Sequence, residues 1–146
     1  MLAKHGVRFL LVGGEAVIYH GYPRLTGDVD FWYEQTLENA TRLFASLREF
    51  WGGSVPGVSA ETDLTQPGVV VQFGRPPHRV DLVSAIDGVS FAEAWAHRVS
   101  ESLDLPDGRR HPLEVIGLSE LVRNKRTAGR HKDLDDVEHL EPLLAK

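Results

Sequence analysis

Residues 12–31, VGGEAVIYHGYPRLTGDVDF, decide the fold that we expect for this chain. The segment begins at the end of an apolar run, Val7–Gly14, which predicts a buried strand ending in a tight glycine turn. A short helical stretch, Glu15–His20, follows, and the segment ends inside a second predicted strand, Asp28–Tyr33. A strand, a helix and a strand in close succession indicate a sheet with helices packed against it.

The remaining sequence extends this alternation of helices and strands. Thr36–Trp51 predicts a helix, because its apolar residues recur at gaps of three and four, whereas Ser54–Gly68 is rich in loop-forming residues. Ser90-Phe-Ala-Glu93 fits a capping box that opens a helix extending to about Glu101. The other segments that we expect are strands at 69–73, 79–86 and 113–116, a turn-rich stretch at 103–112, and helices at 119–128 and 132–144.

The order of these elements predicts an α/β (α+β) fold, in which a mixed β-sheet carries helices packed on it and is followed by a C-terminal helical element. We expect one domain over residues 1–146, with a core at 1–117 and the helical element at 118–146. The apolar fraction of 42% and the charged fraction of 25% are close to the average of globular proteins. The chain is therefore expected to fold around a substantial core.

The composition also excludes several kinds of site. The chain has no cysteine, which rules out disulfides, zinc–thiolate sites, iron–sulfur clusters and a cysteine nucleophile. No apolar run reaches the length of about 18 residues that a membrane span needs. Met1–Gly6 is too short and too polar for a signal peptide. We therefore expect a cytoplasmic protein with no membrane contact.

Charge is divided unevenly along the chain. The net charge of −5 argues weakly against a dedicated nucleic-acid binder. Residues 109–132 nevertheless carry seven basic and two acidic side chains, whereas residues 133–146 carry one basic and five acidic. The basic strip is either a solvated face or a surface that meets an anionic ligand, and the sequence leaves both interpretations open.

Asp28-Val29-Asp30 is the sharpest chemical feature of the sequence. Residues i and i+2 of a strand face the same side, roughly 6.5–7 Å apart, so two carboxylates placed there repel each other. Mg²⁺ relieves that repulsion, because it prefers hard oxygen ligands. Asp81 lies inside another predicted strand, and if the two strands are neighbours, three carboxylates converge, which is enough for a two-metal site.

Two further patterns show how weak such signals are alone. Asp133-Leu134-Asp135 repeats the spacing in a predicted helix, where i and i+2 point to different faces, so we expect this copy at the solvated surface. Gly13-Gly14 either lets the backbone approach a phosphate or simply forms a tight turn. The sequence contains neither the Rossmann nor the P-loop glycine fingerprint.

Together these motifs resemble the nucleotidyltransferase superfamily that shares the catalytic core of DNA polymerase β. The family pattern is an apolar strand, Gly-Gly or Gly-Ser, a short spacer, Asp-apolar-Asp, and a third acid on a later strand. Here it consists of Gly13-Gly14, thirteen intervening residues, Asp28-Val29-Asp30, and then Asp81. Residues 12–31 and residues 124–140, NKRTAGRHKDLDDVEHL, look like a bacterial branch linked to abortive-infection and toxin–antitoxin systems.

The resemblance implies a polymerase-β-like fold and a transfer reaction. A nucleoside triphosphate such as ATP would bind with two Mg²⁺ ions, or with Mn²⁺, an acceptor hydroxyl would attack the α-phosphorus, and pyrophosphate would leave. Asp28, Asp30 and Asp81 would ligate metal, and Asp81 would also help to deprotonate the hydroxyl. The acceptor implied is RNA such as tRNA, or a protein, and a toxin or antitoxin protein is an expected partner.

The chain departs from the family pattern in two ways. Gly14 offers a phosphate only its backbone N–H, because it lacks the hydroxyl of the Gly-Ser version. The first predicted strand begins at about Val7, which leaves open whether a leading helix is missing.

Several basic side chains are candidates for binding the nucleotide. Lys125 falls on the apolar face of its predicted helix, so its ammonium either snorkels to solvent or reaches the triphosphate. Arg126, Arg130 and Lys132 would extend this surface toward phosphates or an RNA backbone.

The acids and polar residues next to these motifs allow two interpretations each. Asp133 and Asp136 share a helix face and either orient the basic residues or form a plain surface network. Arg24 and Thr26 precede the aspartate pair in a family-like Arg-x-Thr-x-Asp arrangement, where they either contact phosphate, position the loop, or serve as ordinary loop residues.

Three functions remain in competition, and the leading one is a Mg²⁺-dependent nucleotidyltransferase of a toxin–antitoxin or defence system. Transfer to a small molecule such as an aminoglycoside ranks lower, because one small domain leaves little room for a large acceptor pocket. A catalytically inactive nucleotide- or partner-binding module, similar to an antitoxin, is disfavoured by the presence of all three carboxylates.

Tyr22 or Trp32 either stacks on a base or packs inside the protein, and the seven histidines show no metal-like spacing.

Overall fold

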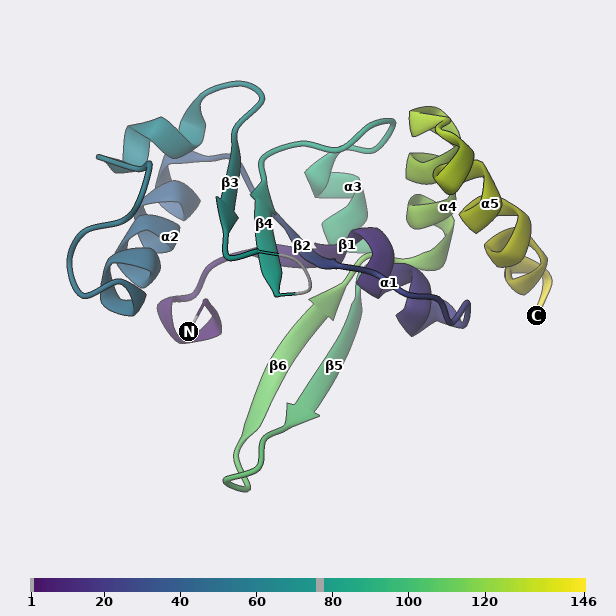
Figure 1. Cartoon of the computed structure of the whole chain (residues 1–146), viewed down its shortest axis with the longest axis horizontal. Helices are drawn as coiled ribbons and strands as arrows, with labels where there is room; N and C mark the ends of the chain where they lie inside the picture. The colour runs from purple at the N-terminus through teal and green to yellow at the C-terminus, as the bar shows by residue number, and fades with distance from the viewer. Residues whose placement is uncertain (1, 76–77) are drawn as a thin grey trace.

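The computed structural model describes residues 2–75 and 78–146 and confirms a mixed α+β fold (Figure 1). Its six strands form one sheet in the order β3-β4-β2-β1-β6-β5. The strands are β1 (Phe9–Val12), β2 (Asp28–Tyr33), β3 (Val70–Phe73), β4 (Arg79–Val83), β5 (Val99–Asp104) and β6 (Arg110–Val115). The helices are α1 (Gly13–His20), α2 (Leu37–Phe50), α3 (Phe91–Ala96), α4 (Leu118–Ala128) and α5 (His131–Leu140), with short 3-10 segments at Ala3–His5, Glu61–Thr65 and Glu141–Ala145.

The sheet is mixed because its central pairs run in different directions. β2 lies antiparallel to β1 and parallel to β4, while β1 also pairs in parallel with β6. The parallel register of β2 and β4 sets Asp28 beside Arg79 and Asp30 beside Asp81. The two strands that carry the predicted metal ligands are therefore neighbours, as the three-carboxylate hypothesis requires.

Helices at opposite ends of the molecule bury the sheet through two apolar clusters (Figure 1). One cluster joins β1 and α1 to the two C-terminal helices and includes Leu10, Ala16, Leu121 and Leu140. The other joins β1 and β2 to α2, and its helix residues are Ala40, Leu43 and Leu47, which recur at the predicted gaps of three and four. Thr36 begins α2 by accepting a hydrogen bond from the Asn39 amide at 3.2 Å.

The glycine pair starts a helix, whereas the sequence predicted a turn before one. Helix α1 begins at Gly13, two residues earlier than predicted, directly after the last residue of β1. Gly13 has a φ of 67°, a conformation that L side chains rarely adopt, and this lets the chain leave the strand and enter the helix without a loop. The glycines consequently lie against the sheet next to β2.

The segment after α3 is where the secondary-structure prediction was wrong. Ser90 does cap α3, accepting a hydrogen bond from the Glu93 amide at 3.3 Å, but the helix ends at Ala96 and not near Glu101. Residues 99–104 form β5, which pairs antiparallel with β6, so the turn predicted over 103–112 shrinks to residues 105–109. Figure 1 shows this hairpin projecting from the rest of the molecule. The sequence pattern of residues 99–104 did not predict β5, because this strand depends on its hydrogen bonds to β6.

Other boundaries moved by a few residues. β4 ends at Val83 and not at Ile86, α5 ends at Leu140, and the predicted remainder of that helix is a 3-10 segment, Glu141–Ala145. The loop predicted over 54–68 includes the 3-10 segment Glu61–Thr65. Within the described part of the chain, no helix has the length and apolar character needed to cross a membrane.

Candidate functional site

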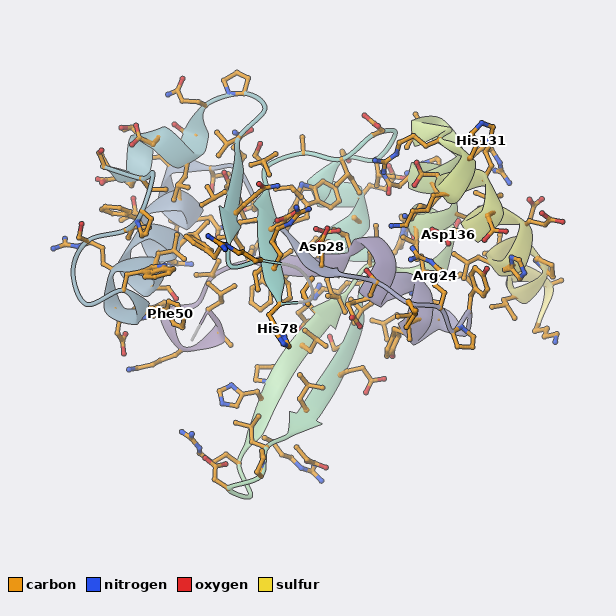
Figure 2. The ribbon with its side chains drawn as sticks, in the orientation of Figure 1. Arg24, Asp28, Phe50, His78, His131 and Asp136 are labelled. Carbon is orange, nitrogen blue, oxygen red and sulfur yellow. The ribbon has the colours of Figure 1, made fainter. Side chains whose placement is uncertain are left out.

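A pocket of about 390 Å³ lies where the sheet meets the C-terminal helices. Its lining includes Gly13 and Gly14 from α1, Asp28 and Asp30 from β2, and Asp81 from β4, and on the opposite side Lys125, Arg130, Lys132 and Asp133. Figure 2 shows Asp28 between the sheet and the helical end of the molecule. The pocket therefore brings together nearly all the site residues predicted from the sequence, at a volume within the usual range for small-ligand sites.

The sheet side of this pocket is acidic. The pKa of Asp30 is raised from its ordinary value of 3.8 to about 6, mainly by burial and then by the negative charges of Asp81 and Asp28. A Cβ added to Gly13 would overlap the Oδ2 atom of Asp30, so only glycine leaves room for that carboxylate. Three carboxylates gathered on one side of a pocket repel one another and together attract a cation.

Arg79 supplies a positive charge within this acidic group, and the sequence analysis missed it. Its Nη2 atom donates to Asp28 Oδ2 at 2.6 Å and to Asp81 Oδ2 at 3.3 Å. The contact follows from the register, because Arg79 is the Cα partner of Asp28 and lies two residues before Asp81 on the same strand face. Arg79-Val80-Asp81 repeats the i, i+2 spacing of Asp28-Val29-Asp30, and this was the signal that could have identified the arginine.

The oxygen donors fit a divalent cation, although they are not yet arranged around one. In residues 2–75 and 78–146, no three His, Cys, Asp or Glu side chains are already grouped to hold a metal ion. Asp81 Oδ1 is buried without a hydrogen-bond partner, because Arg79 Nε, 3.1 Å away, is not aligned to donate to it. A buried carboxylate oxygen left unpaired beside two other carboxylates is the kind of hard ligand that Mg²⁺ prefers.

The helical side of the pocket is basic and is supported by buried acids. Lys125 Nζ lies 3.2 Å from Asp133 Oδ1 and 3.2 Å from Asp136 Oδ2, and both aspartates are fully buried. Arg130 Nε donates to Asp133 Oδ2 at 2.7 Å. Burial raises the pKa of Asp133, but the hydrogen bond from Arg130 and the charge of Lys125 outweigh it and bring the pKa below its usual value.

These contacts correct one prediction and exclude one of the two alternatives left open for Lys125. Asp133 was expected at the solvated surface, yet it is buried beneath the pocket because α5 turns that side chain toward α4. Lys125 does not snorkel to solvent; it stays buried at the pocket lining, where its ammonium donates a hydrogen bond to Asp133 and forms an ion pair with Asp136. Asp133 and Asp136 therefore orient basic residues, and the alternative of a plain surface network is wrong.

Arg24 is held on the far side of the same network. Its Nε and Nη2 atoms donate to the two carboxylate oxygens of Asp136 at 2.8 and 3.0 Å, and Figure 2 shows the two side chains pointing toward each other. This bidentate contact ties the loop before β2 to α5, which favours the loop-positioning interpretation of Arg24. Thr26 lines the pocket, where its Oγ1 atom lies 2.6 Å from the position that a Cβ on Gly14 would take.

The remaining candidates divide between the pocket and other surfaces. Lys132 lines the pocket, whereas Arg126 forms an ion pair with Glu141 at 2.9 Å on the exposed outer side of the helices. Trp32 is buried and donates to the carbonyl of Ser84 at 3.2 Å. Tyr22 is half-buried against the core and stacks on the exposed ring of His139, with ring centroids 3.9 Å apart. Trp32 and Tyr22 therefore both pack against other parts of the protein, Trp32 in the interior and Tyr22 near the surface.

A comparison with protein-family models found none that matches this chain. A comparison with curated proteins likewise found no match.

Proposed function

We propose that this protein is a Mg²⁺-dependent nucleotidyltransferase, which moves a nucleoside monophosphate from a nucleoside triphosphate to an acceptor hydroxyl. The observation that carries the proposal is one pocket with two chemically opposed walls. Asp28, Asp30 and Asp81 form an acidic wall on the sheet side, and Lys125, Arg130 and Lys132 form a basic wall on the helix side. A metal-bound polyphosphate needs both, because its cation binds carboxylates and its phosphate oxygens bind cationic side chains.

The acidic wall would hold the cation. Asp28, Asp30 and Asp81 are the residues available for it, since their strands are adjacent and Asp30 and Asp81 are Cα partners. Mg²⁺ bound there would neutralise charge on the attacking and leaving oxygens of the transfer. Asp81 would in addition accept the proton of the incoming hydroxyl, a role that suits a buried carboxylate with one oxygen free of hydrogen bonds.

The basic wall would bind and orient the triphosphate. Lys125 is held in place by two buried aspartates, so its ammonium approaches a phosphate with little loss of side-chain entropy. Arg130 and Lys132 would add two further charges at the mouth of the pocket. The amides of Gly13 and Gly14 at the start of α1 would supply backbone donors to an anion.

We propose RNA or protein as the acceptor, in a toxin–antitoxin or defence setting. The support is the resemblance of residues 12–31 and 124–140 to that branch of the superfamily. The structure adds that both segments border one pocket, through Gly13, Gly14, Asp28 and Asp30 from the first and Lys125, Arg130 and Lys132 from the second.

Labelled nucleoside triphosphates, incubated with the protein, Mg²⁺ or Mn²⁺, and separate RNA and protein fractions, test the proposal. We expect label to appear in one fraction and to be lost in Asp30→Ala. Asp104→Ala is the matched control, since this carboxylate is 77% exposed on the β5–β6 hairpin, and it should transfer label normally. Absence of transfer with every nucleotide, metal and fraction would reject the proposal.

A nucleotide-binding module without turnover is the second candidate, and one observation favours it. Arg79 already neutralises part of the acidic wall through its ion pairs with Asp28 and Asp81. Calorimetry that shows triphosphate binding independent of Mg²⁺, together with no transfer, would support this alternative.

A further inference from the structure

The acidic wall of the pocket is a two-by-two array of charged side chains, and its fourth corner is basic. The parallel register pairs Asp28 with Arg79 and Asp30 with Asp81 on adjacent strands. All four side chains are at i, i+2 positions, so they share one face of the sheet. Three corners carry a carboxylate and the fourth carries the guanidinium.

We propose that Arg79 is a built-in counter-ion that takes the place of a divalent cation between Asp28 and Asp81, so that a cation binds only when the guanidinium leaves. The inference rests on the proposed function, because it assumes that these carboxylates bind metal. Its support is the bridging contact itself: Arg79 Nη2 reaches Asp28 at 2.6 Å and Asp81 at 3.3 Å, and Nε lies 3.1 Å from the other oxygen of Asp81. A cation held by both acids would have to replace those contacts.

The surroundings of Arg79 allow the exchange. Its side chain is 30% exposed, so the guanidinium can turn toward solvent without crossing the protein core. Arg79 is the first residue of β4. It has a Cα partner in β2, whereas the pairing of β4 with β3 begins at Val80. Its contact with Asp81 is only partly formed, since Nε and Oδ1 both lack a hydrogen-bond partner. A misaligned ion pair gives up less free energy on opening than an aligned one.

The arrangement gives Arg79 two consequences that a simple surface ion pair would not have. Without metal, it offsets repulsion among three carboxylates and so stabilises the fold. With metal present, it competes for the same oxygens and weakens the apparent affinity. Replacing Arg79 should therefore lower stability in the absence of metal and strengthen metal binding.

Calorimetric titration of the full chain with Mn²⁺, after treatment with EDTA and its removal, measures this competition. We expect Arg79→Gln to bind Mn²⁺ about tenfold more tightly than the unsubstituted protein, because two partly exposed ion pairs no longer compete. Arg79→Lys keeps the charge but replaces the planar five-donor guanidinium with a three-donor ammonium on a different stem, so its Mn²⁺ affinity should fall between those of the other two proteins. Arg98→Gln is the matched control: its side chain is 31% exposed and paired with Glu114 at 3.0 Å, and its Mn²⁺ affinity should be unchanged.

Thermal unfolding in EDTA and in saturating Mn²⁺ gives a second readout. Arg79→Gln should melt at a lower temperature than the unsubstituted protein in EDTA, and Mn²⁺ should raise its melting temperature by the larger amount. If Arg79→Gln proves too unstable to titrate, Arg79→Lys retains the test, since its affinity must also rise.

The outcomes separate the inference from the function on which it rests. If the unsubstituted protein binds Mn²⁺ but neither Arg79 variant binds it more tightly, the counter-ion role is wrong and the metal site stands. If neither the unsubstituted protein nor the variants bind Mn²⁺ at millimolar concentration, the metal site fails, and the inference fails with it. If Arg98→Gln gains affinity equally, the effect comes from net charge alone and the inference is also overturned.

Discussion

Replacing Asp136 with Asn is expected to destabilise the protein strongly, because this carboxylate joins three parts of the fold. Asp136 is fully buried, accepts two hydrogen bonds from Arg24 at 2.8 and 3.0 Å, and lies 3.2 Å from Lys125 Nζ. An amide has nearly the same shape but no charge. The substitution would therefore leave the Arg24 guanidinium, whose side chain is 13% exposed, without a counter-charge.

The magnitude follows from the burial of both partners. Removing one member of a buried ion pair costs about 3–5 kcal/mol, and Lys125 keeps Asp133 as a partner, so we expect the lower end, about 3 kcal/mol. For a chain of this size, that corresponds to a fall in melting temperature of about 10 °C.

Urea unfolding followed by circular dichroism measures the change, with Asp135→Asn as the matched control. Asp135 is the preceding residue of the same helix, its side chain is 51% exposed, and it accepts one hydrogen bond from Tyr22. Its replacement should cost less than about 1 kcal/mol. A double-mutant cycle of Asp136→Asn with Arg24→Met should give a coupling free energy above about 1 kcal/mol. Equal effects of the two single asparagine variants, or a coupling near zero, would refute the buried network.

Two further substitutions test the acidic wall. Because the pKa of Asp30 is raised from 3.8 to about 6, the folded protein retains a proton that the unfolded chain loses; the resulting stability is complete below about pH 4 and lost as the pH rises through 6. Asp30→Asn should therefore raise the free energy of unfolding of the metal-free protein by about 1–2 kcal/mol at pH 7.5, a figure already reduced for partial solvent screening. In urea unfolding at a series of pH values, the variant should also lose the fall in stability around pH 6. A steeper fall in the variant would contradict the direction of the pKa shift. Gly13→Ala should destabilise the protein more than Gly108→Ala and should also weaken Mn²⁺ binding. Both glycines have a positive φ, but only a Cβ on residue 13 would overlap Asp30. Equal effects of the two variants in unfolding and in Mn²⁺ titration would contradict this close packing.

Much of the candidate site could be predicted because its signals are local. Asp28 and Asp30 share a strand face whatever the strand pairs with, and an aspartate inside the apolar strand of Asp81 is unusual in any fold. Lys125 was correctly placed on the inner face of its helix by its spacing from Leu121 and Val122. Helix α2 was similarly evident, because its burial follows its own periodicity.

The errors arose where partners distant in the sequence decide the structure. Strand β5 exists because its backbone groups bond to β6, and a strand defined by its partner carries a weak signal of its own. Asp133 looked like a solvent-exposed residue of a polar helix, but Lys125 and Arg130 supply the charges that make its burial tolerable.

The sequence by itself determined the local geometry of the acidic motif, the faces of its helices and the exclusion of cysteine chemistry. Those properties depend on residue type and on spacing along one element. Only the tertiary structure decided that β2 and β4 are neighbours in parallel register, and that register brought Asp81 to Asp30 and Arg79 to Asp28. It also decided that α5 packs on α4, which places Asp136 against Arg24, 112 positions earlier in the chain. Charges so far apart in sequence meet only when the chain folds, which lowers its conformational entropy because the intervening segment is closed into a loop. No pattern within a single helix or strand predicts that contact.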